Sequence, residues 1–414
     1  MPKRETVTTR VERNRLLDVL GSIAERSDSR NDTVELHISP ETVTVRHRDT
    51  RGGRPAVTIT AGPVPFATTK RPAKRATLAV DMAPALSWLQ AYDGRAVRIT
   101  EHRPKAGDPT VVLRNDGPER ATLTLPLKTR HPKTAQDDTH AAAGAFDDRP
   151  DGWAIARTEP LAAAMNALAS FGGRMGWAPI TVGRAKGRKP ARGAHRIELT
   201  VRLHRRTAMI TVPAEANTLT EPVPVPRAAG AALARLAPTT GDVTRISPGR
   251  LGSSGVNAPG FSRIHWPDWM TERELEESRP RDTRRRDADS FSTTIEVKEL
   301  RTVTDLACLP ASRIQTPPEY WSATLDFTRN RIVVQKMGLE TRLSPAPPAT
   351  PAPPGTTPRL SMKNLQDTAG IAAAVGADTL DVIVEPRNRV IEFTTPESST
   401  CFHGIWLESS DRRS

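Results

Sequence analysis

The sequence predicts an α+β protein in which three similar domains each consist of two helix-plus-antiparallel-sheet units. Six amphipathic helical stretches recur along the 414 residues at intervals of about 70 residues, and short segments with strand periodicity follow each one. The predicted helices begin near Thr9, Val80, Thr158, Val225, Glu296 and Leu360. A fixed period of this length indicates one repeated supersecondary unit, so neighbouring units are expected to pair into domains.

Apolar spacing justifies the helices. Val225, Ala229, Ala232, Leu233 and Leu236 form one stripe over three turns, because residues three and four apart share a helix face. The same spacing is present in three further stretches: Met82–Leu89, Leu161–Leu168 and Val297–Leu306. The sequence therefore predicts helices that bury one face each.

The segments after the helices change to strand periodicity. Ile197–Val201, Leu380–Val384 and Val390–Phe393 alternate or run apolar, as half-buried strands do. Arg329–Arg331 and Arg387–Arg389 share the sequence Arg-Asn-Arg, and asparagine tolerates the positive φ of a tight turn. Both are predicted to close β-hairpins.

Changes in composition set the predicted boundaries. Residues 128–150 are polar, and residues 273–290 mix charges of both signs without apolar periodicity, so both are predicted linkers. Residues 344–358 contain seven prolines, which cannot pair in a sheet and indicate a solvated loop. The resulting divisions are domain 1 at 1–127, domain 2 at 151–272, domain 3 at 291–407 and a polar tail at 408–414.

The charge distribution favours a polyanionic partner. The 60 basic and 47 acidic side chains leave a net charge of +13, concentrated in residues 1–127 and 151–272. A solvated, arginine-rich surface is the alternative explanation. The basic segment 183–193 is likewise either a phosphate-contacting loop or a solubilising one.

The sequence lacks the signatures of an enzyme or of a membrane protein. The histidines and the two cysteines, Cys308 and Cys401, show no metal-ligand spacing, and no nucleophile or phosphate-loop motif is complete. We expect no catalysis, no cofactor and no metal. The few cysteines and the lack of a long apolar run favour a reducing, cytoplasmic location without a membrane partner.

Several local motifs carry a family resemblance. Val223–Arg227 leads into a helix, Trp266–Trp269 reads Trp-Pro-Asp-Trp, and His204–Ala208 reads His-Arg-Arg-Thr-Ala. In this order they resemble the bacterial DNA polymerase III beta subunit, the replicative sliding clamp, and the resemblance covers Glu5 to Leu407. The chain departs from the family at Arg202–His204, where the family has Thr-Asp-Gly, and at Gly404–Leu407, where it has Met-Pro-Met-Arg-Leu.

The resemblance implies a DNA-clamp fold that forms a ring, with a function that is physical rather than chemical. A head-to-tail homodimer would encircle double-stranded DNA without reading its sequence and would act as a processivity factor. By analogy with the clamp channel, the DNA-binding residues would be Arg10, Arg13, Arg26, Arg30, Arg174, Trp177, Arg227, Arg235, Lys298, Arg301 and Lys363. The alternative interpretation of each cation is a solvated charge on a helix surface. For Trp177 the alternative is a position in the core.

The resemblance also implies a cleft that receives short linear motifs from DNA polymerase and the clamp loader. Its residues would be Leu203, His204, Arg205, Arg206, Thr207, Pro267, Ile405, Trp406 and Leu407. Trp406 could instead be a core residue that closes the last strand. The second function that the sequence leaves open is a clamp-derived, monomeric binding or regulatory module that does not encircle DNA.

Overall fold

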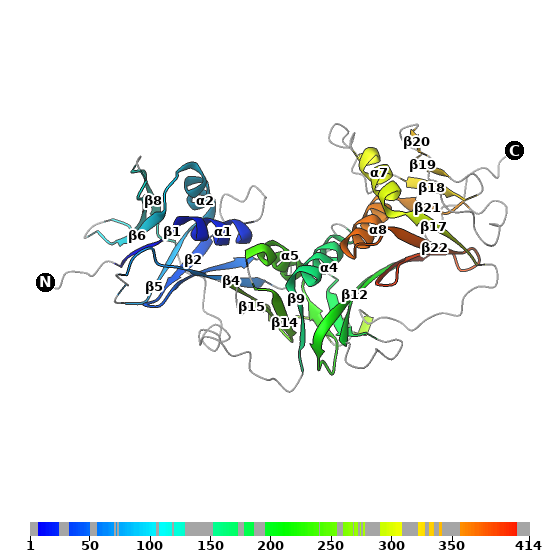
Figure 1. The fold of residues 1–414 in the computed structure, drawn as a ribbon, viewed down its shortest axis with the longest axis horizontal. Helices are drawn as coiled ribbons and strands as arrows, with labels where there is room; N and C mark the ends of the chain where they lie inside the picture. Colours follow the sequence, from blue (N-terminus) through cyan, green and yellow to red (C-terminus); the bar gives the residue numbers. More distant parts are fainter. Residues whose placement is uncertain are drawn as a thin grey trace. The chain divides into compact units, whose positions relative to one another are not determined.

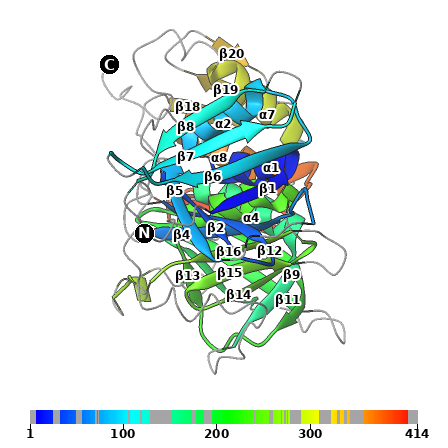
Figure 2. The ribbon, with the colours of Figure 1, turned by 90° about the vertical axis from the view of Figure 1, so that its left-hand side faces the viewer.

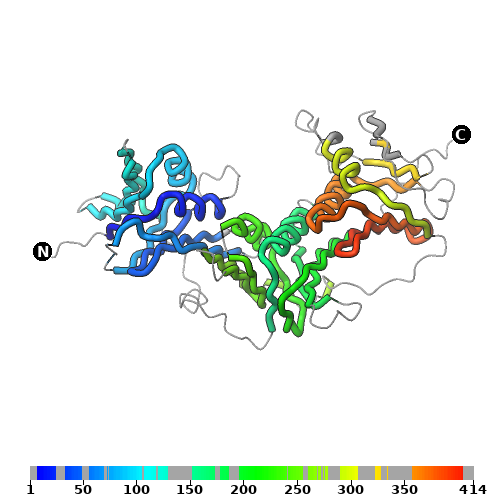
Figure 3. The backbone as a smooth tube through the Cα atoms, in the orientation of Figure 1, coloured from blue at the N-terminus to red at the C-terminus, as the bar shows by residue number. Residues whose placement is uncertain are grey.

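The computed structural model describes most of the helices and strands that the sequence predicts. The described residues are 7–24, 33–49, 56–69, 72, 74–104, 107–117, 120–128, 152–172, 178–185, 195–239, 241–254, 260–267, 269–271, 274, 276–277, 290–308, 322–327, 331–334, 339–341 and 357–403. The chain divides into two compact units. Figures 1 and 3 trace the helices and strands along the sequence, from blue at the N-terminus to red at the C-terminus. Unit 1 comprises Met1–Glu159 and Ala232–Asp268, and unit 2 comprises Pro160–Ala231 and Trp269–Ser414.

One order of elements occurs three times along the described chain: strand, helix, four strands, helix, three strands. The first repeat is β1 (Thr8–Glu12), α1 (Arg13–Ile23), β2 (Thr33–Ile38), β3 (Val43–Asp49), β4 (Val57–Val64), β5 (Ala76–Asp81), α2 (Met82–Ala91), β6 (Ala96–His102), β7 (Thr110–Asn115) and β8 (Thr122–Pro126). The second is β9 (Ala154–Arg157), α4 (Thr158–Ser170), β10 (Ile180–Arg184), β11 (His195–Leu203), β12 (Arg206–Asn217), β13 (Val223–Val225), α5 (Arg227–Leu236) with the short 3₁₀ helix η1 (Ala237–Thr239), β14 (Val243–Ser247), β15 (Arg250–Ser254) and β16 (Phe261–His265). The third is β17 (Phe291–Glu296), α7 (Val297–Cys308), β18 (Ser322–Asp326), β19 (Arg331–Val334), β20 (Leu339–Thr341), β21 (Arg359–Ser361), α8 (Met362–Ala374), β22 (Thr379–Glu385), β23 (Val390–Thr394) and β24 (Ser398–His403).

These elements confirm the predicted α+β class and all six predicted helices. The α1 helix begins at Arg13 rather than near Thr9, because Thr8–Glu12 forms β1 and pairs with β6. The other helices begin at the predicted residue or within two residues of it. The three-domain division stays a prediction, since the two compact units divide the chain within the second repeat.

The sheets repeat as well, and all the strand pairings described below are antiparallel. Unit 1 contains a sheet with the order β1-β6-β7-β8 and a path with the order β9-β14-β15-β16-β4-β3-β2-β5. Unit 2 contains β17-β22-β23-β24-β12, with β11, β10 and β13 joined in turn to β12, and a sheet with the order β20-β19-β18-β21. In each repeat the first strand therefore pairs with the sixth, the sixth with the seventh, and the seventh with the eighth.

One hydrogen bond marks the same position in all three repeats. The first residue of the helix donates its N–H to the carbonyl of the residue that precedes the sixth strand of the repeat. The donors and acceptors are Arg13 N to Arg95 O at 3.2 Å, Thr158 N to Asp242 O at 2.8 Å and Val297 N to Asp378 O at 2.8 Å. A helix N-terminus has N–H groups without an intrahelical acceptor, and this carbonyl satisfies one of them.

Both predicted hairpins are confirmed, with one correction to the turn. β18 pairs with β19, and β22 pairs with β23. In the second turn the positive φ, 51°, belongs to Arg389 rather than to Asn388. The side-chain amide of Asn388 instead donates a hydrogen bond to the Glu385 carboxylate at 3.0 Å, and this bond links the two ends of the turn.

The core of each repeat is formed by the predicted apolar stripes. Leu161, Met165 and Leu168 of α4 are fully buried, and Leu233 and Leu236 of α5 are buried to the same degree. Burial of one stripe per helix leaves the opposite helix face available to solvent, where binding residues can lie. None of the helices in the described ranges is long and apolar enough to cross a membrane.

Candidate DNA-binding and partner-binding sites

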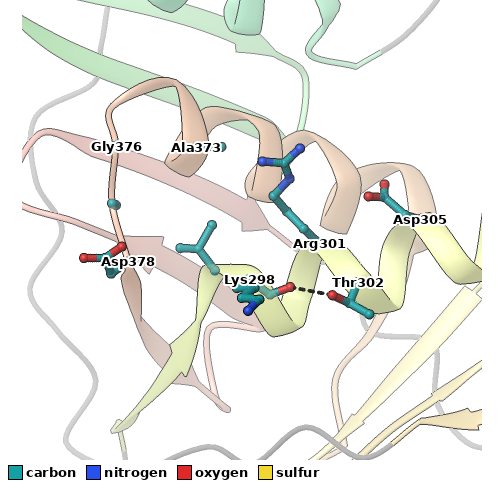
Figure 4. Close-up of a pocket in the computed structure, with 9 residues that line it drawn as sticks. Lys298, Arg301, Thr302, Asp305, Ala373, Gly376 and Asp378 are labelled. Carbon is teal, nitrogen blue, oxygen red and sulfur yellow. Dashed lines mark hydrogen bonds between the residues drawn. The ribbon is translucent and has the colours of Figure 1, made fainter.

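The first candidate site is a polar groove between α7 and the end of α8. It has a volume of about 440 Å³, and Lys298, Arg301, Asp305 and Asp378 lie among the residues that line it. Figure 4 shows Arg301 extending from α7 toward α8, while the Thr302 hydroxyl donates to the Lys298 carbonyl at 2.9 Å. Lys298 and Arg301 are exposed and share one helix face, so both can reach an anion in solution.

Two of the other predicted DNA-binding cations are engaged by neighbouring acids. Lys363 of α8 donates to the Asp367 carboxylate at 2.5 Å, across one helix turn. Arg10 lies on β1 rather than on a helix, and it forms an ion pair with Asp116. Arg235 of α5 is only partly exposed.

Arg13 and Arg227 are buried and donate hydrogen bonds to backbone carbonyls of the same chain. The Arg13 side chain is buried and donates to the carbonyl of Leu89 and, at 2.8 Å, to the side chain of Asn14. The Arg13 guanidinium thus donates to acceptors inside the protein, and so does the Arg227 guanidinium. We therefore leave both residues out of the proposed DNA-binding set.

Arg227 caps the C-terminus of α4. Its guanidinium donates to the carbonyl of Ala178 at 2.9 Å and to that of Phe171, both of which follow the helix. Burial lowers the pKa of Arg227 to about 10, while the charge of Asp367 acts in the opposite direction. The side chain stays protonated at neutral pH, which suits the negative end of a helix.

The second candidate site surrounds the turn between β11 and β12. His204 and Arg205 form the exposed turn, and Arg206 and Thr207 begin β12. β24 pairs with this strand, with Arg206 opposite Phe402 and Thr207 opposite Cys401, and His403 donates its backbone N–H to the Arg205 carbonyl at 2.9 Å. The structure therefore brings the predicted cleft segment next to the last described strand.

Buried apolar side chains pack near this turn. Phe171 and Phe402 are fully buried with ring centroids 6.4 Å apart, and Leu203 is also buried. Gly172 has a φ of +76°, and a Cβ atom there would lie 2.2 Å from Leu203 Cδ1. Glycine is therefore required both for the backbone conformation and for the close approach of Leu203.

Asp367 connects α8 to Gly172, the second residue after α4. The Gly172 N–H donates to Asp367 Oδ2 at 2.7 Å, and Lys363 donates to Oδ1. Burial raises the pKa of Asp367, and the Lys363 charge, the Gly172 hydrogen bond and the Arg206 charge oppose that rise. Asp367 and Gly172 could not be predicted from the sequence, because their pairing across 195 residues leaves no local pattern.

Cys401 lies at the edge of the same site. Its Sγ atom is 3.3 Å from Nε2 of His403, and the cysteine is partly exposed. Within the described residues, no group of three or more His, Cys, Asp or Glu side chains could hold a metal ion.

Several predicted site residues cannot be placed with the others. Pro267 is exposed and belongs to unit 1, whereas Leu203–Thr207 belong to unit 2. Arg26, Arg30, Arg174, Trp177, Ile405, Trp406 and Leu407 lie outside the described residues, as do most of the basic loop 183–193 and of the proline-rich loop 344–358.

Comparisons with solved structures find the same fold in bacterial sliding clamps. No family model and no curated protein matches the sequence. A beta sliding clamp from Caulobacter crescentus, with polyethylene glycol in its beta-motif tethering region, is 13% identical, with a TM-score of 0.64 over 98% of this chain and 100% of that one. The DNA polymerase III beta subunit from Thermotoga maritima is 11% identical, with a TM-score of 0.64 over 97% of this chain and 100% of that one.

A third match is the sliding clamp from Bartonella birtlesii bound to griselimycin. It is 12% identical, with a TM-score of 0.63 over 97% of this chain and 100% of that chain. These likenesses, together with the threefold repeat, define the fold as that of the DNA clamps. In particular, it is the fold of the bacterial DNA polymerase III beta subunit, the replicative sliding clamp, at low sequence identity.

Proposed function

We propose that this chain is a sliding-clamp-like processivity factor that encircles duplex DNA as a head-to-tail homodimer and has no catalytic activity. The observation that carries the proposal is the way successive repeats join. β4 of the first repeat pairs with β16, the last strand of the second, and β12 of the second pairs with β24, the last strand of the third. Both junctions join the same two strand positions.

Within the described residues, the same rule leaves one strand of each kind without a partner in another repeat. β20 occupies the position of β4 and β12, and β8 occupies the position of β16 and β24. Within the described residues, each lies at the end of its sheet order. An exposed sheet edge is a template for a further strand. Pairing of β20 with β8 of a second copy would make the third junction equivalent to the other two, and two copies related head to tail would close.

DNA binding in this proposal is electrostatic and independent of sequence. The net charge of +13 supports attraction to phosphates, and Lys298 and Arg301 are exposed cations on the α7 helix. Lys363 and Arg235 are further candidates. Arg26, Arg30 and Arg174 remain proposed contacts on the strength of the family resemblance alone.

The proposed docking site for the DNA polymerase and the clamp loader is the surface around Leu203–Thr207 and the end of β24. The exposed turn at His204 and Arg205 supports this assignment. By the family resemblance, a short linear motif that docks there would insert aliphatic and aromatic anchors, and aromatic side chains are enriched among the residues that contribute most to binding. Ile405, Trp406 and Leu407 remain proposed members of this docking site on the strength of the family resemblance alone.

Two measurements test the proposal. Sedimentation across micromolar concentrations should show twice the chain mass of 45.1 kDa, since both interfaces of a closed dimer form together. The loaded protein should stay on nicked circular duplex and leave the same DNA after it is linearised. A monomer at all concentrations, with equal retention on both DNA forms, would refute encirclement and favour the monomeric binding or regulatory module.

A further inference from the structure

Three arginines face one another across neighbouring strands of the β1-β6-β7-β8 sheet. Arg10 of β1 lies opposite Arg98 of β6, and Arg98 lies opposite Arg114 of β7. Residues directly opposite in antiparallel strands project from the same face of a sheet. The three side chains therefore form one row, here called the arginine row. Figure 2 shows the strands of this sheet in blue and cyan.

This face points away from the core. Val11, Val97, Ile99 and Leu113 alternate with the row and are buried, whereas Arg98 and Arg114 are exposed. Arg10 pairs with Asp116, but neither Arg98 nor Arg114 forms an ion pair within the described part of the chain. Like charges placed directly opposite on a sheet are destabilising, so the fold does not benefit from the row.

The internal repeat shows that the fold does not require these arginines. Glu12, Arg157 and Glu296 each precede the first helix of a repeat, and counting back two residues from each gives the equivalent positions. The row that is Arg10–Arg98–Arg114 in the first repeat is Ile155–Arg245–Gly252 in the second and Thr294–Asp381–Thr394 in the third.

The single arginine of the row in the second repeat is also differently placed, since the Arg245 guanidinium stacks over the ring of Trp153 at 4.7 Å. In the third repeat the row includes an acid, and Thr294 donates to the Asp381 carboxylate at 3.0 Å. Only the first of the three equivalent rows therefore places three cations side by side without an aromatic support.

The remainder of this face identifies the kind of partner. The neighbouring row carries hydroxyl groups, with Thr8 opposite Thr100 and Thr124 opposite Val112. Threonine and arginine side chains contact phosphate oxygens. The described strands present no Phe, Tyr or Trp on this face, although protein interfaces and single-stranded nucleic acid both depend on such anchors.

We propose that the arginine row is a second nucleic-acid contact, which binds the phosphate backbone of duplex DNA on the sheet face of the first repeat, away from its helices. This contact does not depend on ring closure. It would hold a duplex segment outside any ring, independently of base sequence and with a steep dependence on salt.

The test uses a 20-base-pair duplex with a streptavidin at each end, because a blocked duplex cannot enter a ring. Fluorescence anisotropy of the full chain is measured between 50 and 200 mM salt for the wild type, for the double variant Arg98→Gln with Arg114→Gln, and for a control. The control, Arg157→Gln with Arg196→Gln, removes the same charge from two exposed strand residues. Loss of two phosphate contacts should lower the slope of log K against log salt by about 1.8 and weaken binding about 60-fold at 0.1 M salt.

The melting temperature shows whether each variant is folded. Relief of like-charge repulsion should leave the Arg98/Arg114 variant at least as stable as the wild type. Equal slopes and affinities for this variant and the control would overturn the proposal. Tighter binding of a single-stranded oligonucleotide than of the blocked duplex would also overturn it. Retention on circular DNA is scored separately, so failure of the arginine row and failure of encirclement give different results.

Discussion

Replacing Asp367 by alanine should destabilise unit 2, whereas replacing it by asparagine should have little effect at neutral pH. Asp367 is 5% exposed, and its carboxylate accepts hydrogen bonds from Gly172 N–H at 2.7 Å and from Lys363 at 2.5 Å. Alanine leaves the Gly172 N–H without its acceptor, which costs about 1–3 kcal/mol. Asparagine keeps an acceptor oxygen and removes the desolvation cost of the charge, so we expect a change within about 1 kcal/mol.

The sign of the pH dependence follows from the direction of the pKa shift. Burial raises the pKa of Asp367 above its ordinary value of 3.8, so the folded protein binds this proton more tightly than the unfolded chain does. The stability contributed by the group is therefore present below pH 3.8 and is lost as the pH rises through the folded pKa. Relative to Asp367→Asn, the wild type should be most stable at acidic pH.

Thermal unfolding of the wild type and both variants, measured from pH 3 to pH 8, tests this reasoning. The alanine variant should melt about 4–8 °C lower for a loss of about 2 kcal/mol in a unit of this size. The difference between the wild type and the asparagine variant should change with pH in the stated direction. A pH-independent difference, or equal melting of the alanine and asparagine variants, would refute the role assigned to the buried carboxylate.

Three further predictions concern the same sites. Arg227→Lys should cost about 3 kcal/mol in thermal unfolding, because an ammonium group cannot reproduce the guanidinium geometry and leaves buried carbonyls unpaired, and DNA affinity per folded molecule should not change. Gly172→Ala should lower the melting temperature and weaken binding of a polymerase-derived peptide in calorimetry, because the new Cβ would lie 2.2 Å from Leu203 Cδ1 at a φ of +76°. Lys298→Gln with Arg301→Gln should reduce the salt slope of DNA binding by about 1.8 in anisotropy titrations without a change in melting temperature, and an unchanged slope would remove α7 from the DNA contact.

The helices and hairpins could be predicted because their causes are local. The stripe from Val225 to Leu236 requires only a helical period and one buried face, and both are visible in the order of residues. The turn at Arg387–Arg389 was predicted for the same reason. The residue with positive φ was misassigned there, because the Asn388 side chain bonds to Glu385 and the next residue takes the unusual backbone conformation.

The amino-acid sequence by itself determined the class, the threefold repeat and the excess of positive charge, since periodicity and composition do not depend on how distant segments meet. Tertiary structure alone decided which charges are available. Arg227 and Arg98 carry the same charge in the sequence. In the structure, Arg227 is buried and donates to backbone carbonyls near the end of α4, whereas Arg98 is exposed and lies opposite two other arginines. Strand register and burial separate them, because they depend on contacts between residues far apart in the chain.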